Sequence, residues 1–230
     1  MSLITPEQFD SRSFIYRKHQ QAEYIEVAGA AQVLSYEGQS AQGEGAQGQN
    51  DPDIGLTDLS VLPRFGLRGP AAGDALVAAG LLQPEKPNTL TLSDEGLMVL
   101  RLGYNEYWLL AVPDATVDLS ALEQQLTGPG IYPVYCHDSY AWLVMSGDHL
   151  ADVMAKVCAV DLREKNFSLG DLVMTSLARV SGVICHHQMA GKPVFSIFSD
   201  SASAGYLWDA LLDAMGEFNG TPVGQNSLLK

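Results

Sequence analysis

Residues 65–79 read FGLRGPAAGDALVAA, and residues 143–157 read LVMSGDHLADVMAKV. In both stretches alternating apolar residues precede a glycine, Gly69 or Gly147. Four apolar residues then follow at offsets three, six, seven and ten from that glycine. Alternation is typical of a strand with one buried face, whereas the second spacing places four side chains on one face of a helix. The two stretches therefore predict the same unit twice: a strand, a glycine turn and an amphipathic helix.

The segments that follow each unit also repeat. Apolar runs separated by polar turns predict three strands and a closing helix in each half. The expected strands are at 89–92, 97–102 and 107–111, then at 173–177, 180–186 and 194–198, with closing helices at 119–126 and 204–215. Strands in hairpin runs with helices between the groups indicate an α+β fold with antiparallel sheets. The chain is expected to contain two pseudo-repeated strand-helix-strand-strand-strand-helix halves.

Composition divides the chain into four parts. Residues 37–53 read EGQSAQGEGAQGQNDPD and carry no aliphatic side chain larger than alanine. Such a segment buries too little surface to offset its ordering entropy, which predicts a flexible Gly/Gln-rich loop over 37–55. Before it lies an N-terminal arm, 1–36, with a strand expected at 31–36. After it comes the duplicated domain, 56–220, with halves of about 56–135 and 136–220, and then a frayed tail, 221–230.

The charge balance limits the classes of partner. Thirteen basic and twenty-seven acidic side chains give a net charge of −14. That charge repels nucleic acid and anionic membrane surfaces. We found no apolar run near the roughly 20 residues that span a bilayer, and the first residues do not resemble a signal peptide. The three cysteines cannot all pair within one chain and have no CxxC spacing. These features favour a reduced bacterial cytoplasm.

Two Cys–His clusters are the strongest candidates for chemistry. Residues 136–138 read Cys-His-Asp between two expected strands, and residues 185–187 read Cys-His-His at the end of another. Thiolate and imidazole are zinc ligands, and a Cys–His pair can form an activated nucleophile. Neighbouring strand residues, however, point to opposite faces, so Cys185 and His186 would not converge on one ion. His137 and Asp138 are typical of a turn.

Other chemistry has even less support. There is no GxGxxG after a strand and no GxxxxGK[ST], which argues against a Rossmann or P-loop fold. Asp94 and Glu95 lie in an expected turn, and Asp161 follows a helix without a visible partner. Seven aromatic residues could line a stacking pocket, although aromatic side chains in strands are more often core or interface: Tyr104, Tyr107, Trp108, Tyr132, Tyr135, Tyr140 and Trp142. We expect no catalytic, cofactor-binding or metal-ligating residue in this chain.

Four segments of the sequence resemble a known family. Residues 58–70, DLSVLPRFGLRGP, resemble the D-[LV]-S-x-[LM]-x-[RK]-[FI]-x-[VL]-x-G-P opening of the aminomethyltransferases. The Arg-Phe-Gly form, together with CAVDLR at 158–163 and GDLVMT at 170–175, is similar to the gamma subunit of heterotetrameric sarcosine oxidase. The segment 204–212, AGYLWDALL, is similar to the final helix of that family. The resemblance covers roughly 56–220.

The resemblance implies a folate-binding-type aminomethyltransferase fold without the C-terminal barrel, because the sequence stops at Lys230. Departures from the family accompany it. Folate-dependent relatives present an acidic residue near the strand expected at 97–102, which here reads LMVLRL. The K-G-C-Y-x-G-Q signature of the iron–sulfur-linked branch is also missing. These departures argue against folate binding by this chain.

The resemblance therefore implies a non-catalytic gamma-type subunit that helps to assemble and stabilise a sarcosine-oxidase-like complex. The complex would oxidatively demethylate sarcosine or a related N-methyl amine. FAD, FMN, NAD and tetrahydrofolate would bind to partner subunits, and the contact partner would be the larger alpha-type subunit. The alternative is a stand-alone folate- or pterin-binding protein related to the aminomethyltransferases.

Overall fold

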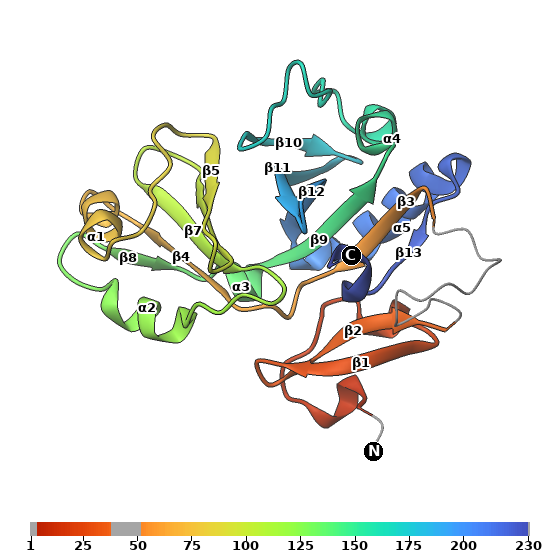
Figure 1. Ribbon diagram of the computed structural model, residues 1–230, viewed down its shortest axis with the longest axis horizontal. Helices are drawn as coiled ribbons and strands as arrows, with labels where there is room; N and C mark the ends of the chain where they lie inside the picture. The colour runs from red at the N-terminus through yellow and green to blue at the C-terminus, as the bar shows by residue number, and fades with distance from the viewer. Residues whose placement is uncertain (1–3, 38–51, 230) are drawn as a thin grey trace.

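Both strand–glycine–helix units form in the computed structural model, which describes residues 4–37 and 52–229 (Figure 1). β4 (Arg64–Arg68) leads through Gly69 into α1 (Ala72–Ala78), and β9 (Tyr140–Gly147) leads into α4 (Leu150–Val157). Gly69 has φ 129° and Gly147 has φ 127°, a region that glycine alone adopts readily. A Cβ atom at either position would lie 2.2 Å from a carbonyl oxygen of Gly130 or Asp53.

Each unit is followed by the three strands and the helix that the sequence predicts. The first half contains β5 (Thr89–Leu92), β6 (Leu97–Arg101), β7 (Glu106–Ala111) and α2 (Leu119–Gln125). The second half contains β10 (Leu172–Leu177), β11 (Val180–Met189), β12 (Lys192–Asp200) and α5 (Ala204–Met215). The α+β class with antiparallel sheets is confirmed, and the predicted bounds of α5 match the structure.

The strands form two large sheets that continue into each other. The five-stranded sheet has the order β5-β6-β7-β4-β8, and the six-stranded sheet has the order β10-β11-β12-β9-β3-β13. β3 (Ile54–Asp58), β8 (Tyr132–Val134) and β13 (Thr221–Pro222) complete them. Every pair is antiparallel except β13 with β3. The edge strands β5 and β10 adjoin through two hydrogen bonds near their ends: Leu90 N of β5 donates to Gly170 O at 2.8 Å, and Leu172 N of β10 donates to Asn88 O at 3.0 Å.

The two halves exchange one strand each. β3 precedes β4 along the chain but pairs with β9 in the other sheet, and β8 precedes β9 but pairs with β4. The registers of the two exchanged strands are equivalent. Arg68 and Ser146 each directly precede the glycine of their unit, and they pair with Tyr132 of β8 and Gly55 of β3. Contiguous halves of 56–135 and 136–220 therefore do not describe the structure. Periodicity along the chain reports which strands exist but not which sheet they join.

The core has three apolar layers: one lies between the two large sheets, and one lies on the outer face of each sheet. α1 and α2 cover the outer face of the five-stranded sheet, and α4 and α5 cover that of the six-stranded sheet (Figure 1). The inner faces of the two sheets enclose what we call the inter-sheet layer. Its buried members include Met98, Leu100, Leu110, Trp108, Trp142, Val144, Val183, Cys185, Val194 and Phe198.

The N-terminal arm is an antiparallel hairpin and the C-terminal residues pack against it. β1 (Ala22–Val27) pairs with β2 (Ala30–Tyr36), which confirms the strand predicted at 31–36. Residues 221–229 are not a frayed tail as expected: β13 joins a sheet, and Val223, Gln225 and Leu228 are buried. Short 3-10 helices complete the chain: η1 (Pro6–Gln8), η2 (Tyr16–Lys18), η3 (Ser201–Ser203), η4 (Gly216–Phe218) and η5 (Gln225–Leu228).

Three further boundaries differ from the sequence expectation. The loop predicted over 37–55 ends earlier, because Ile54 and Gly55 belong to β3; residues 38–51 of that prediction lie outside the described residues. A short helix, α3 (Cys136–Ser139), stands where a loop was expected. The hairpin between β11 and β12 turns on Ala190 and Gly191 alone, both with positive φ, as two-residue hairpin loops require. Both strands are consequently longer than predicted.

Candidate functional site

The motif segment, residues 58–70, forms the junction between the two halves. Arg64 is buried, and its Nη1 donates to the carbonyl oxygens of Ser60 and Leu62 at 3.0 Å. Its Nη2 donates to the carbonyl oxygens of His137 at 3.0 Å and Tyr140 at 2.5 Å. Burial lowers the pKa of Arg64 to about 10, so the guanidinium is still cationic at neutral pH. Arg64 therefore holds the β3–β4 corner against α3 and β9 rather than facing a ligand.

Asp58 begins the same motif and connects it to the N-terminal arm. Its Oδ2 accepts hydrogen bonds from Ser13 Oγ and, at 2.9 Å, from His19 Nε2, and its Oδ1 accepts one at 2.9 Å from Ser60 N. The other ring nitrogen of His19, Nδ1, lies 2.7 Å from the hydroxyl oxygen of Tyr36. Only 1% of the His19 side chain and 2% of the Asp58 side chain are exposed. We call these four side chains (Ser13, His19, Tyr36 and Asp58) the arm network.

Electrostatics keep Asp58 ionised in this buried place. Burial alone would raise the pKa of Asp58, but hydrogen bonds and charge from His19, with hydrogen bonds from Ser13 and Ser60, lower it below its usual range. Burial, with the nearby charge of Asp58, raises the pKa of Tyr36 above its usual range. The arm network therefore links four hydrogen-bonded side chains, and its His19–Asp58 contact is closed to solvent. It attaches the arm to the core.

Sequence reasoning missed the arm network. Asp58 was recognised only as part of the motif, and Ser13, His19 and Tyr36 lie outside the region recognised from motifs, 56–220. The one available signal that this carboxylate is buried was its place within the largely apolar stretch 54–62, IGLTDLSVL.

The inter-sheet layer contains three of the seven aromatic candidates: Trp108, Trp142 and Tyr140. The ring centroids of Trp108 and Tyr140 are 4.7 Å apart, and those of Trp142 and Phe198 are 5.5 Å apart. Trp108, Trp142 and Tyr107 are buried, Tyr140 is half-buried, and Tyr104, Tyr132 and Tyr135 are exposed. Packed rings of this kind are core, so the stacking pocket considered from the sequence does not form from the buried members of the set.

A serine–histidine contact inside this layer resembles a nucleophile and its base but is closed to substrate. His187 Nε2 lies 2.7 Å from Ser196 Oγ, and Trp142 Nε1 donates to the same oxygen at 2.9 Å. Ser196 has no exposed surface. Burial lowers the pKa of His187 to about 4, so the imidazole is neutral at pH 7. The three side chains satisfy one another within the core.

The two Cys–His clusters do not assemble a metal site in the part of the chain that the structure describes. Cys185 faces the inter-sheet layer, whereas His186 stacks on Phe167 at the opposite face. That arrangement agrees with the alternation inferred from the sequence. Cys136 is buried, while His137 and Asp138 form an exposed contact of 3.2 Å on α3. The clusters are core and surface residues of ordinary kind.

We expect the buried thiols to be unreactive in the folded protein. Cys136 and Cys185 are free and fully buried, and burial raises the pKa of Cys136 to about 12. At pH 8 this lowers the thiolate fraction roughly a thousandfold relative to a free cysteine. In a Cys158→Ser variant, Ellman's reagent should react with the remaining thiols rapidly in concentrated urea and far more slowly in native buffer. A fast-reacting thiol in the native protein would contradict this burial.

The acidic candidates are also structural. Asp94 and Glu95 are exposed in the β5–β6 turn, where the carbonyl oxygen of Glu95 accepts a hydrogen bond of 2.9 Å from Thr116 N. Asp161 is bound locally by Arg163, whose Nη2 lies 2.6 Å from its Oδ2. Hydrogen bonds from Arg163 lower the pKa of Asp161 below its usual range. β6 presents Met98 and Leu100 to the inter-sheet layer, without a carboxylate.

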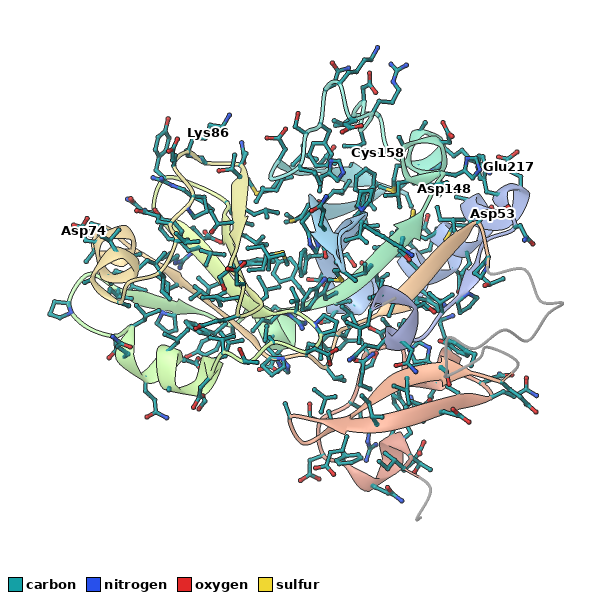
Figure 2. The ribbon with its side chains drawn as sticks, viewed as in Figure 1. Asp53, Asp74, Lys86, Asp148, Cys158 and Glu217 are labelled. Atoms are coloured by element: carbon teal, nitrogen blue, oxygen red, sulfur yellow. The ribbon has the colours of Figure 1, made fainter. Side chains whose placement is uncertain are left out.

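Two open hollows lie at equivalent ends of the two sheets. The first lies beside the Gly69 turn, the hairpin turn before β7 and the exchanged strand β8. The second lies beside the Gly147 turn, the start of β12 and the exchanged strand β3. The first, about 380 Å³, is lined by Arg68, Gly69, Gly103, Tyr104, Asn105, Glu106 and Tyr132. The second, about 500 Å³, is lined by residues including Asp53, Gly55, Ser146, Gly147, Asp148, Lys192 and Val223. Figure 2 shows Asp53 and Asp148 close together there, and Asp148 N donates to Asp53 O at 3.1 Å.

The architecture and the motif segment agree with a family comparison. The sequence model of one protein family, the GCVT N-terminal domain, matches residues 15–229. The chain belongs to this family. The match extends further toward the N-terminus than the region recognised from motifs, which agrees with the arm being packed into the domain.

Curated relatives of this GCVT-type domain are aminomethyltransferases. The protein from Saccharopolyspora erythraea is 26% identical over 215 residues, which cover 88% of this chain and 57% of that protein. The protein from Mycobacterium tuberculosis (strain ATCC 25618 / H37Rv) is 25% identical over 214 residues, covering 88% and 56%. The chain therefore spans a little over half the length of these relatives.

Two solved structures share the fold. A chain of heterotetrameric sarcosine oxidase from Corynebacterium sp. U-96, in complex with pyrrole 2-carboxylate, has a TM-score of 0.63 at 24% identity, covering 75% of this chain and 89% of that chain. Glycine cleavage system aminomethyltransferase T from Bartonella henselae has a TM-score of 0.67 at 21% identity, covering 95% and 62%. Among the described residues, no helix has the length and apolar character of a membrane span.

Proposed function

We propose that this GCVT-type chain is a non-catalytic gamma-type subunit of a sarcosine-oxidase-like complex. The complex would oxidatively demethylate sarcosine or a related N-methyl amine. FAD, FMN, NAD and tetrahydrofolate would bind to its partners, of which the larger alpha-type subunit would contact this chain.

The structural match to a chain of heterotetrameric sarcosine oxidase carries the proposal. The match to the sarcosine oxidase chain accounts for 89% of that chain, whereas the match to aminomethyltransferase T accounts for only 62% of that protein. The fold described here therefore accounts for most of one chain of the oxidase. Fold alone does not set function, so the proposal also depends on the site.

The side chains support an assembly role. The motif segment that identifies the family holds the fold together through Asp58 and Arg64. The inter-sheet layer is filled with apolar and aromatic side chains. The Ser196–His187 contact is buried, and the acidic candidates lie in exposed local turns. These observations support the proposal that the chemistry of the complex belongs to other subunits.

The test is purification of the tagged chain from its own host, with mass spectrometry of the subunits and an absorbance scan for flavin. We expect a yellow complex that contains the large sarcosine oxidase subunit and oxidises sarcosine, while the isolated chain shows no turnover. An active large-subunit preparation that never contains this chain would contradict the proposal.

A ligand titration distinguishes the assembly role from the alternative, a stand-alone folate- or pterin-binding protein. Calorimetry of the isolated chain with tetrahydrofolate should give no binding heat if folate is held by a partner. Saturable binding to the isolated chain, without any flavin-bearing partner, would instead favour the stand-alone folate- or pterin-binding protein.

A further inference from the structure

Exposed tyrosines gather at the free edge of the five-stranded sheet. Tyr132 on β8 is 58% exposed, and Tyr135, just beyond the strand, is 69% exposed. Tyr104, in the turn before β7, is 81% exposed and lines the first hollow together with Tyr132. β8 is the last strand of its sheet among the described residues. Exposed aromatic side chains beside an open strand edge are typical of protein interfaces.

The backbone of this edge has one acceptor available. Ala111 N donates to Pro63 O at 3.1 Å and Gly69 N donates to Asn105 O at 2.9 Å, so odd-numbered residues along β4 bond to β7. The even-numbered residues, Gly66 and Arg68, therefore face β8, where they pair with Val134 and Tyr132. Pro133, between these two, directs its carbonyl oxygen away from β4. It is exposed and has no N–H to donate.

The other half of the molecule shows what fits such an edge. Leu56 of β3 occupies the position equivalent to Pro133, and its carbonyl oxygen accepts a hydrogen bond of 3.0 Å from Val223 N. This bond belongs to the parallel pairing of β13 with β3. Val223 lies over Gly55, where an added Cβ would come within 2.6 Å of its side chain. An extended C-terminal segment thus covers the edge of β3.

Among the described residues, no segment pairs with the outer edge of β8 as β13 pairs with β3. The position that Gly55 has in β3 is held in β8 by Tyr132. We propose that the outer edge of β8, with Tyr132 and Tyr135, is the docking site for an extended segment of the large partner subunit, aligned parallel to β8. The inference rests on the proposed function and adds the surface that makes the contact. The segment would donate one backbone N–H to the Pro133 carbonyl oxygen. It would place a small residue against Tyr132, because the tyrosine ring occupies space that Gly55 leaves to Val223.

The test compares tyrosine variants in the co-expressed complex. The chain is produced together with the large sarcosine oxidase subunit of the same organism, and the affinity is measured for the wild type and for Tyr132→Ala/Tyr135→Ala. We expect the double variant to bind about 10- to 100-fold more weakly, since interface tyrosines are frequent hot spots. Tyr206→Ala is the matched control, because Tyr206 is 53% exposed on α5, away from β8. Circular dichroism and urea unfolding verify that each variant folds.

Hydrogen exchange supplies a readout that does not depend on a variant. Amides of residues 130–137 should become protected when the large subunit binds, whereas those of residues 204–212 should not change. Normal affinity of the double variant, or no added protection at 130–137 in an intact complex, would overturn the docking site while leaving the proposed function standing. Failure of the wild-type chain to bind the large subunit would overturn both. A dimer of the isolated chain that the double variant abolishes would identify a second copy as the occupant instead.

Discussion

Replacing Asp58 by alanine is expected to lower the free energy of unfolding by about 3–5 kcal/mol, the range for breaking a buried charge pair. The variant leaves His19 and Ser13 without their shared acceptor inside the core. A domain of this kind has a total stability of only about 5–15 kcal/mol, so the loss is a large share of it. Urea unfolding at neutral pH measures the change through the transition midpoint.

The control for this prediction is Asp209→Ala, which also removes a carboxylate that binds the arm. Asp209 pairs with Lys18 at 2.7 Å, but its side chain is 63% exposed. An exposed ion pair is worth at most about 1 kcal/mol. If Asp58→Ala and Asp209→Ala destabilise the protein equally and slightly, the arm network does not hold the arm to the core.

The same carboxylate should give the protein an acid-sensitive component of stability. The pKa of Asp58 is lower in the folded than in the unfolded protein, so its stabilising effect is complete above the unfolded pKa of roughly 4. The effect is lost as the pH falls from there through the folded pKa. The stability difference between wild type and Asp58→Asn should therefore shrink on acidification below about pH 4. A difference that stays constant would contradict the ionised state of Asp58.

Alanine at Gly69 or at Gly147 should destabilise the protein by about 4 kcal/mol in either case. The added Cβ would lie 2.2 Å from a backbone carbonyl oxygen at both positions, and both residues have positive φ. Backbone strain contributes about 1–3 kcal/mol and the steric overlap about 1–3 kcal/mol. Equal losses would reflect the equivalence of the two turns. Urea unfolding of the single variants provides the comparison.

Gly191→Ala is the matched control for these turns. Gly191 also has a positive φ, 77°, but an added Cβ there would meet nothing within 4 Å. Replacing it should lower the free energy of unfolding only by the strain of a left-handed backbone, about 1–2 kcal/mol. Losses as small as this at Gly69 and Gly147 would show that the neighbouring strands do not approach them as closely as the structure indicates.

Part of the candidate site was predictable from local rules. Alternation along a strand correctly placed Cys185 and His186 on opposite faces. It did not show which aromatic residues would be exposed. Trp142 and Tyr132 both lie in strands, but the opposite sheet covers Trp142 and does not cover Tyr132. The arm network was equally out of reach, since Asp58 and His19 are far apart in sequence and meet only through tertiary packing.

The sequence by itself determined the repeated unit and the α+β class. Apolar spacing and the two glycines act within a few residues, so local sterics and side-chain direction are enough to predict strands, turns and helices there. Only the tertiary structure decided that β3 and β8 cross into opposite sheets and that residues 221–229 cover one sheet edge but not the other. Strand pairing depends on backbone hydrogen bonds between distant segments, and these carry no side-chain signature along the chain.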